Sequence, residues 1–388
     1  IGVRLVGSEM CIRDSLKKIF LFALVMSGGL ISPVHAVDRS ESPRVMFVNP
    51  GRTGEVFWDM ISNFMAAAAR DLNIDLEVVT AERDHLKMIE LALQASSSDN
   101  PPDYMILVNE KLAAGKMLDE LPTSIKLMLL NNNLSAEQTD KYGVPRQIKE
   151  NWVASIYPDH EKAGYDIGTA ITAAAGQAGY PAMNENLGLL AIGGNRATPA
   201  SVQRVEGLHR VMAARTDIDL YQTIHSQWRR EKAESQMRGL IRRWPETRLI
   251  WAANDRMALG AMDAAIKLGR KPGQDVFIGG LNWSGEALER VRDGSMTASV
   301  GGHFMQGGWL MVLIHDFHAG RDFSDIGVEF TAPMSVIDTN NVALYLSVFG
   351  DQDWDRIDFS RFSRGTKEAG FRYEFGLDKI LAQFKGEK

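Results

Sequence analysis

One stretch decides the fold class: Leu249-Ile-Trp-Ala-Ala-Asn-Asp-Arg-Met-Ala-Leu-Gly-Ala-Met-Asp-Ala-Ala265. Its first part, residues 249–253, is a short apolar run, which is typical of a strand buried on both faces of a parallel sheet. The run ends at Asn254 and Asp255, and a helical pattern begins directly after them. In open α/β sheets, ligands bind at the carboxyl ends of strands, where loops lead into helices. Asn254 and Asp255 are therefore predicted to lie at a ligand-binding edge.

The same strand-then-helix pattern repeats on both sides of this stretch. Short apolar or β-rich runs predict strands at residues 44–49, 76–79, 104–108, 125–130, 152–156, 187–192, 220–224, 276–279, 297–300 and 334–337. Apolar residues at helical spacing predict helices at residues 55–72, 86–95, 111–121, 159–174, 198–214, 233–244, 257–268, 286–292, 304–317, 342–348 and 376–384. Residues 131–150 are polar and predict turns. The alternation predicts an α/β fold with right-handed βαβ units and parallel sheets, in two similar halves.

The length of 388 residues exceeds the usual size of one domain, which predicts two lobes. We expect an N-terminal lobe from residues 37–157 and 303–332, and a C-terminal lobe from residues 158–302 and 333–346. Residues 347–388 form a C-terminal extension, which is aromatic enough to pack against the lobes.

The N-terminus has the pattern of a secretory signal peptide. Lys17 and Lys18 precede a short apolar run at residues 19–31, and small residues mark a cleavage site after Ala36. Residues 1–15 are predicted to be flanking sequence. The single cysteine, Cys11, lies in the removed part, so the mature chain is expected to have no disulfide. The predicted location is the periplasm.

Composition and motifs exclude several classes of function. A formal charge of −6, with no basic block, argues against a nucleic-acid partner. The sequence has no Gly-x-Ser-x-Gly elbow, no His-Glu-x-x-His motif and no phosphate loop, so we expect no enzyme activity and no cofactor. No metal is expected: His315 and His318 have no third ligand nearby in the sequence, and residues 351–362 lack the Gly and Glu of a calcium loop.

Four motifs in order carry a resemblance to a known family. They are Gly193-Gly194 followed by Arg204-Val-Glu-Gly207, Asn254-Asp-Arg-Met-Ala-Leu-Gly-Ala261, Ile278-Gly-Gly-Leu-Asn282, and Asp293-Gly294 before Thr297-Ala-Ser-Val300. Together they resemble the type I periplasmic solute-binding proteins, the ribose-binding and autoinducer-2-binding group of sugar ABC transporter substrate-binding proteins. The resemblance covers most of residues 44–340. It implies two Rossmann-like lobes, joined by a three-strand hinge, that close over a ligand.

The resemblance also implies a set of ligand contacts. Arg204 matches an arginine that binds ligand hydroxyls as a bidentate fork, and a solvated helix arginine is the alternative. Asn131 and Asn282 stand where many members have aspartate, and Glu55-Val56 replaces the usual Asn-Pro, so the ligand's identity stays open. The predicted ligand-binding residues are Phe57, Trp58, Asn131, Arg204, Asn254, Asn282, Trp283 and His303.

The residue types refine several of these roles. Asp255 is predicted mainly to cap the following helix, while the amide of Asn254, which both donates and accepts, contacts ligand. Asp159 is predicted to be a helix cap with hinge contacts. Phe57 and Trp58 occupy consecutive helix positions, so we expect one in the core and one in the cleft. Trp283 is predicted to stack on ligand, with a packing or lid role as the alternative.

These observations predict a periplasmic binding protein that captures a small polar ligand, a sugar or sugar-like molecule, and delivers it to an ABC importer. The alternative is a ligand-sensing periplasmic subunit for a membrane histidine kinase, cyclase or chemoreceptor. A third hypothesis, a secreted α/β enzyme, predicts turnover of the ligand. The predicted partners are an ABC permease or a membrane sensor, and the protein is expected to be a monomer.

Overall fold

The computed structural model describes residues 42–181, 185–365 and 371–384. All of them belong to one compact unit that begins at Arg39. The predicted signal peptide, the cleavage site after Ala36 and Cys11 lie outside the described residues.

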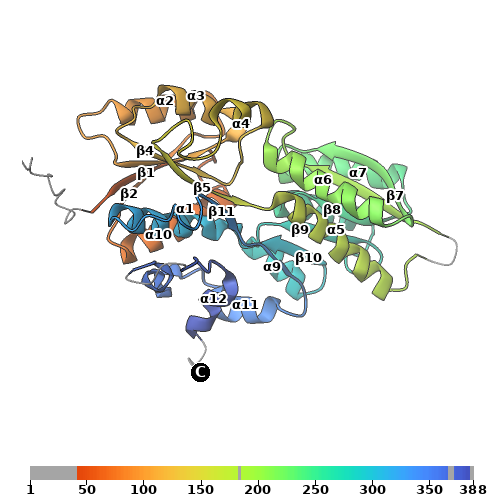
Figure 1. Ribbon diagram of the computed structural model, residues 1–388. Coiled ribbons are helices and arrows are strands. Elements are labelled where there is room, and N and C mark those ends of the chain that lie inside the picture. Colours follow the sequence, from red (N-terminus) through yellow and green to blue (C-terminus); the bar gives the residue numbers. More distant parts are fainter. Residues whose placement is uncertain (1–41, 182–184, 366–370, 385–388) are drawn as a thin grey trace, which may run out of the picture. The chain divides into compact units, whose positions relative to one another are not determined.

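Two six-stranded sheets form the framework (Figure 1). The first sheet has the order β11-β5-β4-β3-β1-β2, and every neighbouring pair is parallel. Its strands are β1 (Arg44–Asn49), β2 (Asp75–Thr80), β3 (Tyr104–Val108), β4 (Lys126–Leu130), β5 (Trp152–Pro158) and β11 (Glu329–Ala332). Its helices are α1 (Val56–Asp71), α2 (His85–Ser96), α3 (Ala114–Glu120), α4 (Ala136–Tyr142) and α10 (Gln306–His318). We call this sheet with its helices the first lobe.

The second sheet has the order β12-β10-β9-β8-β6-β7, and only β12 runs antiparallel to its neighbour. Its strands are β6 (Leu187–Gly193), β7 (Ile218–His225), β8 (Thr247–Ala252), β9 (Phe277–Leu281), β10 (Ala298–Gly301) and β12 (Ser335–Ile337). Its helices are α5 (His160–Gln177), α6 (Pro199–Ala214), α7 (Arg230–Arg243), α8 (Asp255–Lys267) and α9 (Gly285–Arg292). This sheet with its helices is the second lobe.

The chain passes between the two sheets three times: from β5 into α5, from β10 into α10, and from β11 into β12. The prediction of an α/β fold with two lobes and a three-strand hinge is therefore confirmed. The exact lobe boundaries at residues 157, 302, 332 and 346 stay a prediction.

Residues 249–265, which decided the fold class, form the end of strand β8 and most of helix α8, as their composition predicts. β8 and the adjoining Ala253 are buried between the layers of the second lobe. The indole of Trp251 is fully buried, and its Nε1 donates a hydrogen bond of 2.9 Å to the carbonyl oxygen of Gly164 in α5. The single polar atom of this large side chain is thus satisfied, as burial requires.

Residues 131–150, for which the sequence predicts turns, also contain the helix α4, which the sequence analysis missed. Ser135 accepts from the Gln138 amide at 3.2 Å, and the Gln138 side chain accepts from the Ser135 amide at 3.1 Å. This reciprocal pair is a capping box, which satisfies two amide groups at the start of the helix. The Ser-x-x-Gln pattern was visible in the sequence, but the polar composition of α4 concealed the helix.

The C-terminal segment from α11 (Val342–Phe349) onward packs against both lobes, and α11 spans the predicted boundary at residue 346. This helix contacts α9, and Tyr345 places its ring 5.1 Å from that of Trp283. Further along, Phe359 packs against Phe64 of α1, and Phe362 against Trp309 of α10. The expectation that this aromatic segment packs is confirmed. Across the described ranges, every helix is too short or too polar to cross a membrane.

Candidate functional site

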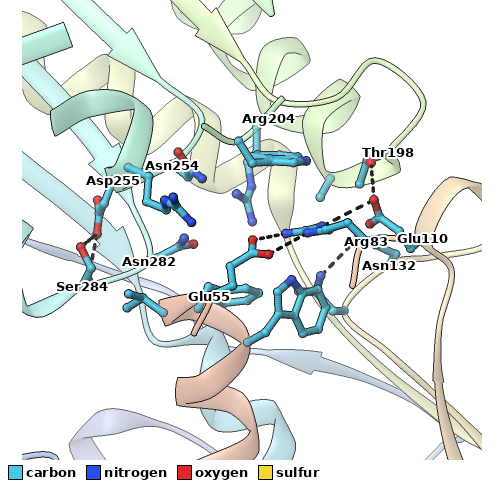
Figure 2. Close-up of a pocket in the computed structure, with 17 residues that line it drawn as sticks. Glu55, Arg83, Glu110, Asn132, Thr198, Arg204, Asn254, Asp255, Asn282 and Ser284 are labelled. Atoms are coloured by element: carbon cyan, nitrogen blue, oxygen red, sulfur yellow. Dashed lines mark hydrogen bonds and ion pairs between the residues drawn. The ribbon is translucent and has the colours of Figure 1, made fainter. Parts of the chain in front are cut away.

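A cavity lies where the strand ends of the two lobes face each other (Figure 2). Glu55, Arg83 and Glu110 reach into it from loops and a helix end of the first lobe, and Arg204, Asn254 and Asn282 from the second. Its full lining is Glu55, Val56, Phe57, Trp58, Arg83, Glu110, Asn131, Asn132, Thr198, Ala200, Arg204, Trp228, Asn254, Asp255, Arg256, Asn282 and Ser284.

Unusual backbone conformations hold several of these residues in place. Four pairs of consecutive non-glycine residues have positive φ, and each pair lies in the loop after a strand: 82–83 after β2, 111–112 after β3, 227–228 after β7 and 282–283 after β9. Such conformations cost about 1 kcal/mol or more per residue and concentrate at functional sites. Arg83, Trp228 and Asn282 are members of these pairs that line the cavity.

Aromatic side chains from both lobes line the cavity. Phe57 and Trp58 come from the first turn of α1, and Trp228 from the loop after β7. Two glycines make room for the indoles: a Cβ on Gly51 would lie 2.6 Å from Trp58, and one on Gly194 would lie 2.2 Å from Trp228. The Gly193-Gly194 pair in the sequence therefore has a steric reason.

Trp58 is a core side chain with 2% of its surface exposed, as expected for one member of the pair, but both Phe57 and Trp58 line the cavity. Their ring centroids are 5.2 Å apart in an edge-to-face arrangement. Consecutive residues point in different directions from the side of a helix. This cavity lies beyond the end of α1, so both directions of the first turn reach it.

A buried ion-pair cluster belongs to the first lobe. The Arg83 guanidinium binds Glu55 through two hydrogen bonds, one of them 2.9 Å from Nε to Oε2, and Nη1 lies 3.5 Å from Glu110 Oε1. Burial alone would raise the pKa of Glu55, but the hydrogen bonds and charge of Arg83 lower it. Thr198 of the second lobe donates its hydroxyl to Glu110 Oε1 at 3.3 Å, which is a direct hydrogen bond between the lobes.

Arg204 is the buried cation of the second lobe, with 4% of its surface exposed. Its Nη1 donates to the carbonyl oxygen of Ala253 at 2.8 Å, and its Nε donates to Nδ1 of His160 at 3.3 Å. Burial lowers the pKa of Arg204 to about 9, against the attraction of Asp255, so the guanidinium stays charged at neutral pH. Burial and the Arg204 charge push the pKa values of His160 and His303 well below their usual range, so both rings are neutral.

Two glycines bring Arg204 to this position. A Cβ on Gly207 would lie 2.0 Å from the carbonyl oxygen of Glu161, and one on Gly164 would lie 1.9 Å from that of Arg204. Only glycine at both positions allows α5 and α6 to approach this closely. The sequence motif Arg204-Val-Glu-Gly207 therefore combines a side chain in the cavity with a residue that permits the helix contact.

The assignment of the helix cap to Asp255 is wrong. Asn254 is the N-cap of α8, and its Oδ1 accepts from the Met257 amide at 2.9 Å. Asp255 turns away and accepts three hydrogen bonds, from the amide and hydroxyl of Ser284 and from the hydroxyl of Ser299. Burial raises the pKa of Asp255 to about 6, although these hydrogen bonds and Arg204 act in the opposite direction. Asn254 lines the cavity as well, so its Nδ2 donors can serve a ligand while Oδ1 caps the helix.

Four buried polar atoms of the lining have no hydrogen-bond partner among the described residues. Two belong to the first lobe, Trp58 Nε1 and Asn132 Nδ2, and two to the second, Trp228 Nε1 and Asn282 Oδ1. Leaving such a group unpaired costs about 1–3 kcal/mol, so buried polar groups rarely lack partners. A polar ligand in this cavity would satisfy all four.

Six of the eight predicted ligand-binding residues line the cavity: Phe57, Trp58, Asn131, Arg204, Asn254 and Asn282. Asn131 Oδ1 accepts from the Gln306 side chain at 3.0 Å, so this oxygen already has one hydrogen-bond partner within the protein. Direct contact of these residues with ligand stays a prediction.

Trp283 and His303 lie outside the lining. Trp283 donates from Nε1 to the Ser299 carbonyl oxygen at 3.0 Å and covers Gly301, so it has the packing role that was the alternative to stacking on ligand. His303 stacks on Phe57, with ring centroids 4.6 Å apart, and its Nε2 lies 3.4 Å from Arg204 Nη2. His303 therefore contacts two lining residues, Phe57 and Arg204, without lining the cavity itself.

Asp159 is the N-cap of α5, with its side chain accepting from the Lys162 amide at 2.8 Å. The sequence reasoning missed several lining residues, of which Arg83, Glu110 and Trp228 are the most consequential. Each lies within four residues of the end of a predicted strand, so the rule that selected Asn254 would have selected them. Among the described residues, no group of three or more His, Cys, Asp or Glu side chains could hold a metal ion.

Comparison with known proteins shows which family has this architecture. A family model described as a periplasmic binding protein domain matches residues 45–320. The crystal structure of a periplasmic sugar-binding protein from Pseudomonas fluorescens is 36% identical, with a TM-score of 0.80, and the match covers 87% of this chain and 99% of that one. A galactofuranose-binding protein has a TM-score of 0.67 at 15% identity, over 80% of this chain and 99% of that one, which shows a shared fold.

The ribose import binding protein of Salmonella typhimurium is 26% identical over 152 residues, which are 39% of this chain and 47% of that protein. The match therefore spans about half the length of this relative. The family model, in contrast, covers most of the described residues, including both lobes and the cavity. The chain belongs to the periplasmic binding proteins, in their type I fold.

Proposed function

We propose that the protein captures a sugar or sugar-like ligand in the cavity between its lobes and delivers it to an ABC importer. The observation that carries this proposal is the set of four unpartnered polar atoms, two from each lobe. A single ligand that pairs with all four would hold the lobes together. Ligand binding would then favour the closed conformation, which a membrane partner can recognise.

The chemistry of the lining fits a carbohydrate. The indoles of Trp58 and Trp228 offer flat apolar surfaces for the C–H faces of a sugar ring. Their Nε1 groups and Asn132 Nδ2 donate, while Asn282 Oδ1 accepts, and a sugar hydroxyl can pair with either kind of group. The name of the similar Pseudomonas fluorescens protein, a periplasmic sugar-binding protein, points to the same ligand class.

The proposed location is the periplasm, after removal of the signal peptide at Ala36, and the proposed state is a monomer. The alternative is a sensor that presents the closed form to a membrane histidine kinase, cyclase or chemoreceptor. The C-terminal segment from α11 onward, which contacts both lobes, supports this alternative because a partner could detect its position. Neighbouring genes for a permease and an ATPase would favour the importer, and a neighbouring sensor gene would favour the alternative.

A thermal-shift screen of the mature chain over sugars, polyols and nucleosides tests the proposal. We expect at least one sugar to raise the midpoint by several degrees, with recovery of the unchanged sugar by mass spectrometry. Asn282→Ala should weaken binding about tenfold, because it removes one buried acceptor. Asn186→Ala, at an exposed side chain that hydrogen-bonds Asp219, is the matched control and should bind normally. Absence of any shift, or chemical conversion of the sugar, would contradict the proposal.

A further inference from the structure

The opening of the cavity forms a second hollow with a strong positive charge. It shares Glu55, Arg83, Glu110, Trp228 and Arg256 with the cavity and adds other polar residues around them. Its charged side chains are Arg52, Lys111, Arg229 and Arg256, together with the Arg83–Glu55–Glu110 cluster. Five cations against two carboxylates leave an excess of three positive charges, in a chain whose formal charge is −6. We call this hollow the cleft mouth.

Four of its cations form no close ion pair. Glu82, Asp84 and Glu55 attract Arg52, Lys111 and Arg256 only over longer distances. Arg83 is paired with Glu55 and lies near Glu110, as described above. Arg52, Lys111, Arg229 and Arg256 form no ion pair with any carboxylate in the described ranges. The neighbouring Arg230 shows the contrast, because it binds both Asp263 and Glu286. Arg52, Lys111, Arg229 and Arg256 therefore carry the excess positive charge of the cleft mouth.

The positions of these cations are unfavourable for the protein alone. Arg229 is the N-cap of α7, and Arg256 lies in the first turn of α8. Helix N-termini carry a partial positive charge and favour anions, so a cation there is destabilising. Lys111 has a φ of 48°, in the left-handed region that non-glycine residues avoid. A bound anion would offset the two electrostatic costs, at Arg229 and Arg256.

The four cations are divided equally between the lobes. Arg52 and Lys111 belong to the first lobe, in the loop before α1 and the turn after β3, and Arg229 and Arg256 belong to the second. Closure of the lobes brings the two pairs to the rim of one hollow. Without an anion between them, their mutual repulsion opposes closure.

We propose that the ligand is an acidic carbohydrate, whose ring occupies the cavity and whose carboxylate or phosphate group lies in the cleft mouth. This inference rests on the proposed function and narrows it to one chemical class. The anion bridges Arg52 and Lys111 of one lobe to Arg229 and Arg256 of the other. A neutral sugar leaves the repulsion in place, so the closed state selects the charged ligand.

Matched ligands test the inference by isothermal titration calorimetry. Each neutral sugar, for example glucose, galactose or ribose, is compared with its carboxylate and its phosphate ester. We expect one acidic form to bind at least tenfold more tightly than its neutral parent. Because charge causes the preference, it should shrink steeply between about 50 and about 300 mM salt. The carboxylate and phosphate arms identify which anion the cleft mouth accepts.

The variant Lys111→Gln/Arg229→Gln removes one cation from each lobe. We expect the ratio of acidic to neutral affinity to fall at least tenfold. A control, Lys116→Gln/Arg242→Gln, removes the same charge from exposed positions of α3 and α7 that do not line the cleft mouth, and should keep the ratio. The thermal midpoint without ligand shows that each variant is folded.

The outcomes separate this inference from the proposed function. A neutral sugar that binds as tightly as its acidic forms overturns the inference and leaves the proposed function standing. An acidic preference that persists in Lys111→Gln/Arg229→Gln also overturns it, because these cations would then not cause the preference. Failure of every sugar, neutral or acidic, overturns the proposed function itself.

Discussion

The guanidinium of Arg204 and the imidazole of His160 are 3.3 Å apart, from Nε to Nδ1, and both side chains are buried. On its other side, Nε2 of His160 lies 2.9 Å from the carbonyl oxygen of Asn131 in the first lobe. His160 therefore accepts from Arg204 and donates to Asn131, which requires the neutral ring with its proton on Nε2. This chain connects the cation of the second lobe to the first lobe beside the hinge strand β5.

Replacing Arg204 by alanine should abolish stabilisation by ligand, because it removes the fork that faces the cavity. Arg204→Lys should weaken binding about tenfold or more, since an ammonium group cannot donate in two parallel directions. Calorimetry measures both effects, with circular dichroism as the check on folding. Unchanged affinity in Arg204→Ala would contradict the placement of ligand in this cavity.

The two buried histidines should make stability depend on pH. Their pKa values are lowered on folding, so the unfolded chain binds more protons below about pH 6.5, and stability falls as the pH falls. His303→Gln should reduce this slope by up to about 1.4 kcal/mol per pH unit between about pH 6.5 and about pH 5. Asp255 has a raised pKa, so its protonation increases stability as the pH falls below about 6. This contribution is the same in the wild-type protein and in His303→Gln. Urea titrations across this range measure the difference, and identical slopes would refute it.

Two substitutions at Asn254 should distinguish its role as the cap of α8 from its role as a donor to ligand. Asn254→Ser keeps an oxygen that can cap α8, so stability should stay within a few tenths of a kcal/mol, while loss of the amide donors weakens ligand binding about tenfold. Asn254→Ala should lose both the cap, at about 1 kcal/mol, and the donors. Paired urea and calorimetry measurements distinguish these patterns, and full ligand affinity in Asn254→Ser would show that Asn254 only caps the helix.

Gly194 should be intolerant of a side chain. The Cβ of Gly194→Ala would meet the Trp228 indole at 2.2 Å, so the indole must shift away from the cavity. We expect a loss of about 1–3 kcal/mol in stability and weaker binding of ligand. Gly239→Ala in α7 is the matched control: its Cβ meets nothing within 4 Å, and replacing a helix glycine stabilises by up to about 1 kcal/mol. Equal binding by both variants would exclude a role for the Trp228 position.

Asp316 anchors the C-terminal extension to α10. This fully buried carboxylate accepts hydrogen bonds from Ser363, the Arg364 amide and Tyr373 of the extension. Burial alone would raise its pKa, but these bonds and one from His315 outweigh burial and lower the pKa to about 2. The stabilisation is present above about pH 3.8 and is lost as the pH falls toward 2.

Asp316→Asn should therefore destabilise the protein by about 2–4 kcal/mol near neutral pH. Hydrogen exchange should show loss of protection at residues 359–363, the part of the extension that packs against α1 and α10. The control is Asp355→Asn, at an ion pair with Arg70 whose side chains are 61% and 60% exposed, and which should cost less than about 1 kcal/mol. Equal effects of the two variants would refute the anchoring role.

Much of the fold was predictable because it depends on local patterns. The apolar run before Asn254 and the helical spacing after it define β8 and α8 without help from distant residues, and repetition of that pattern implies parallel sheets. The rule that ligands bind beyond strand ends placed Asn254 at the cavity, and the family resemblance placed Asn131, Arg204 and Asn282 there. Polar α4 escaped notice because its pattern lacks an apolar face.

The sequence alone determined the order of strands and helices apart from α4, the α/β class and the edge of each sheet where polar residues gather. Only the tertiary structure decided which of two neighbouring polar residues caps α8, that Trp228 rather than Trp283 lines the cavity, and that Arg83 is neutralised while Arg229 is not. The physical reason is that element formation follows from spacing within one segment. The direction of a loop side chain depends instead on its own φ, often positive here, and on partners that lie far away in the sequence.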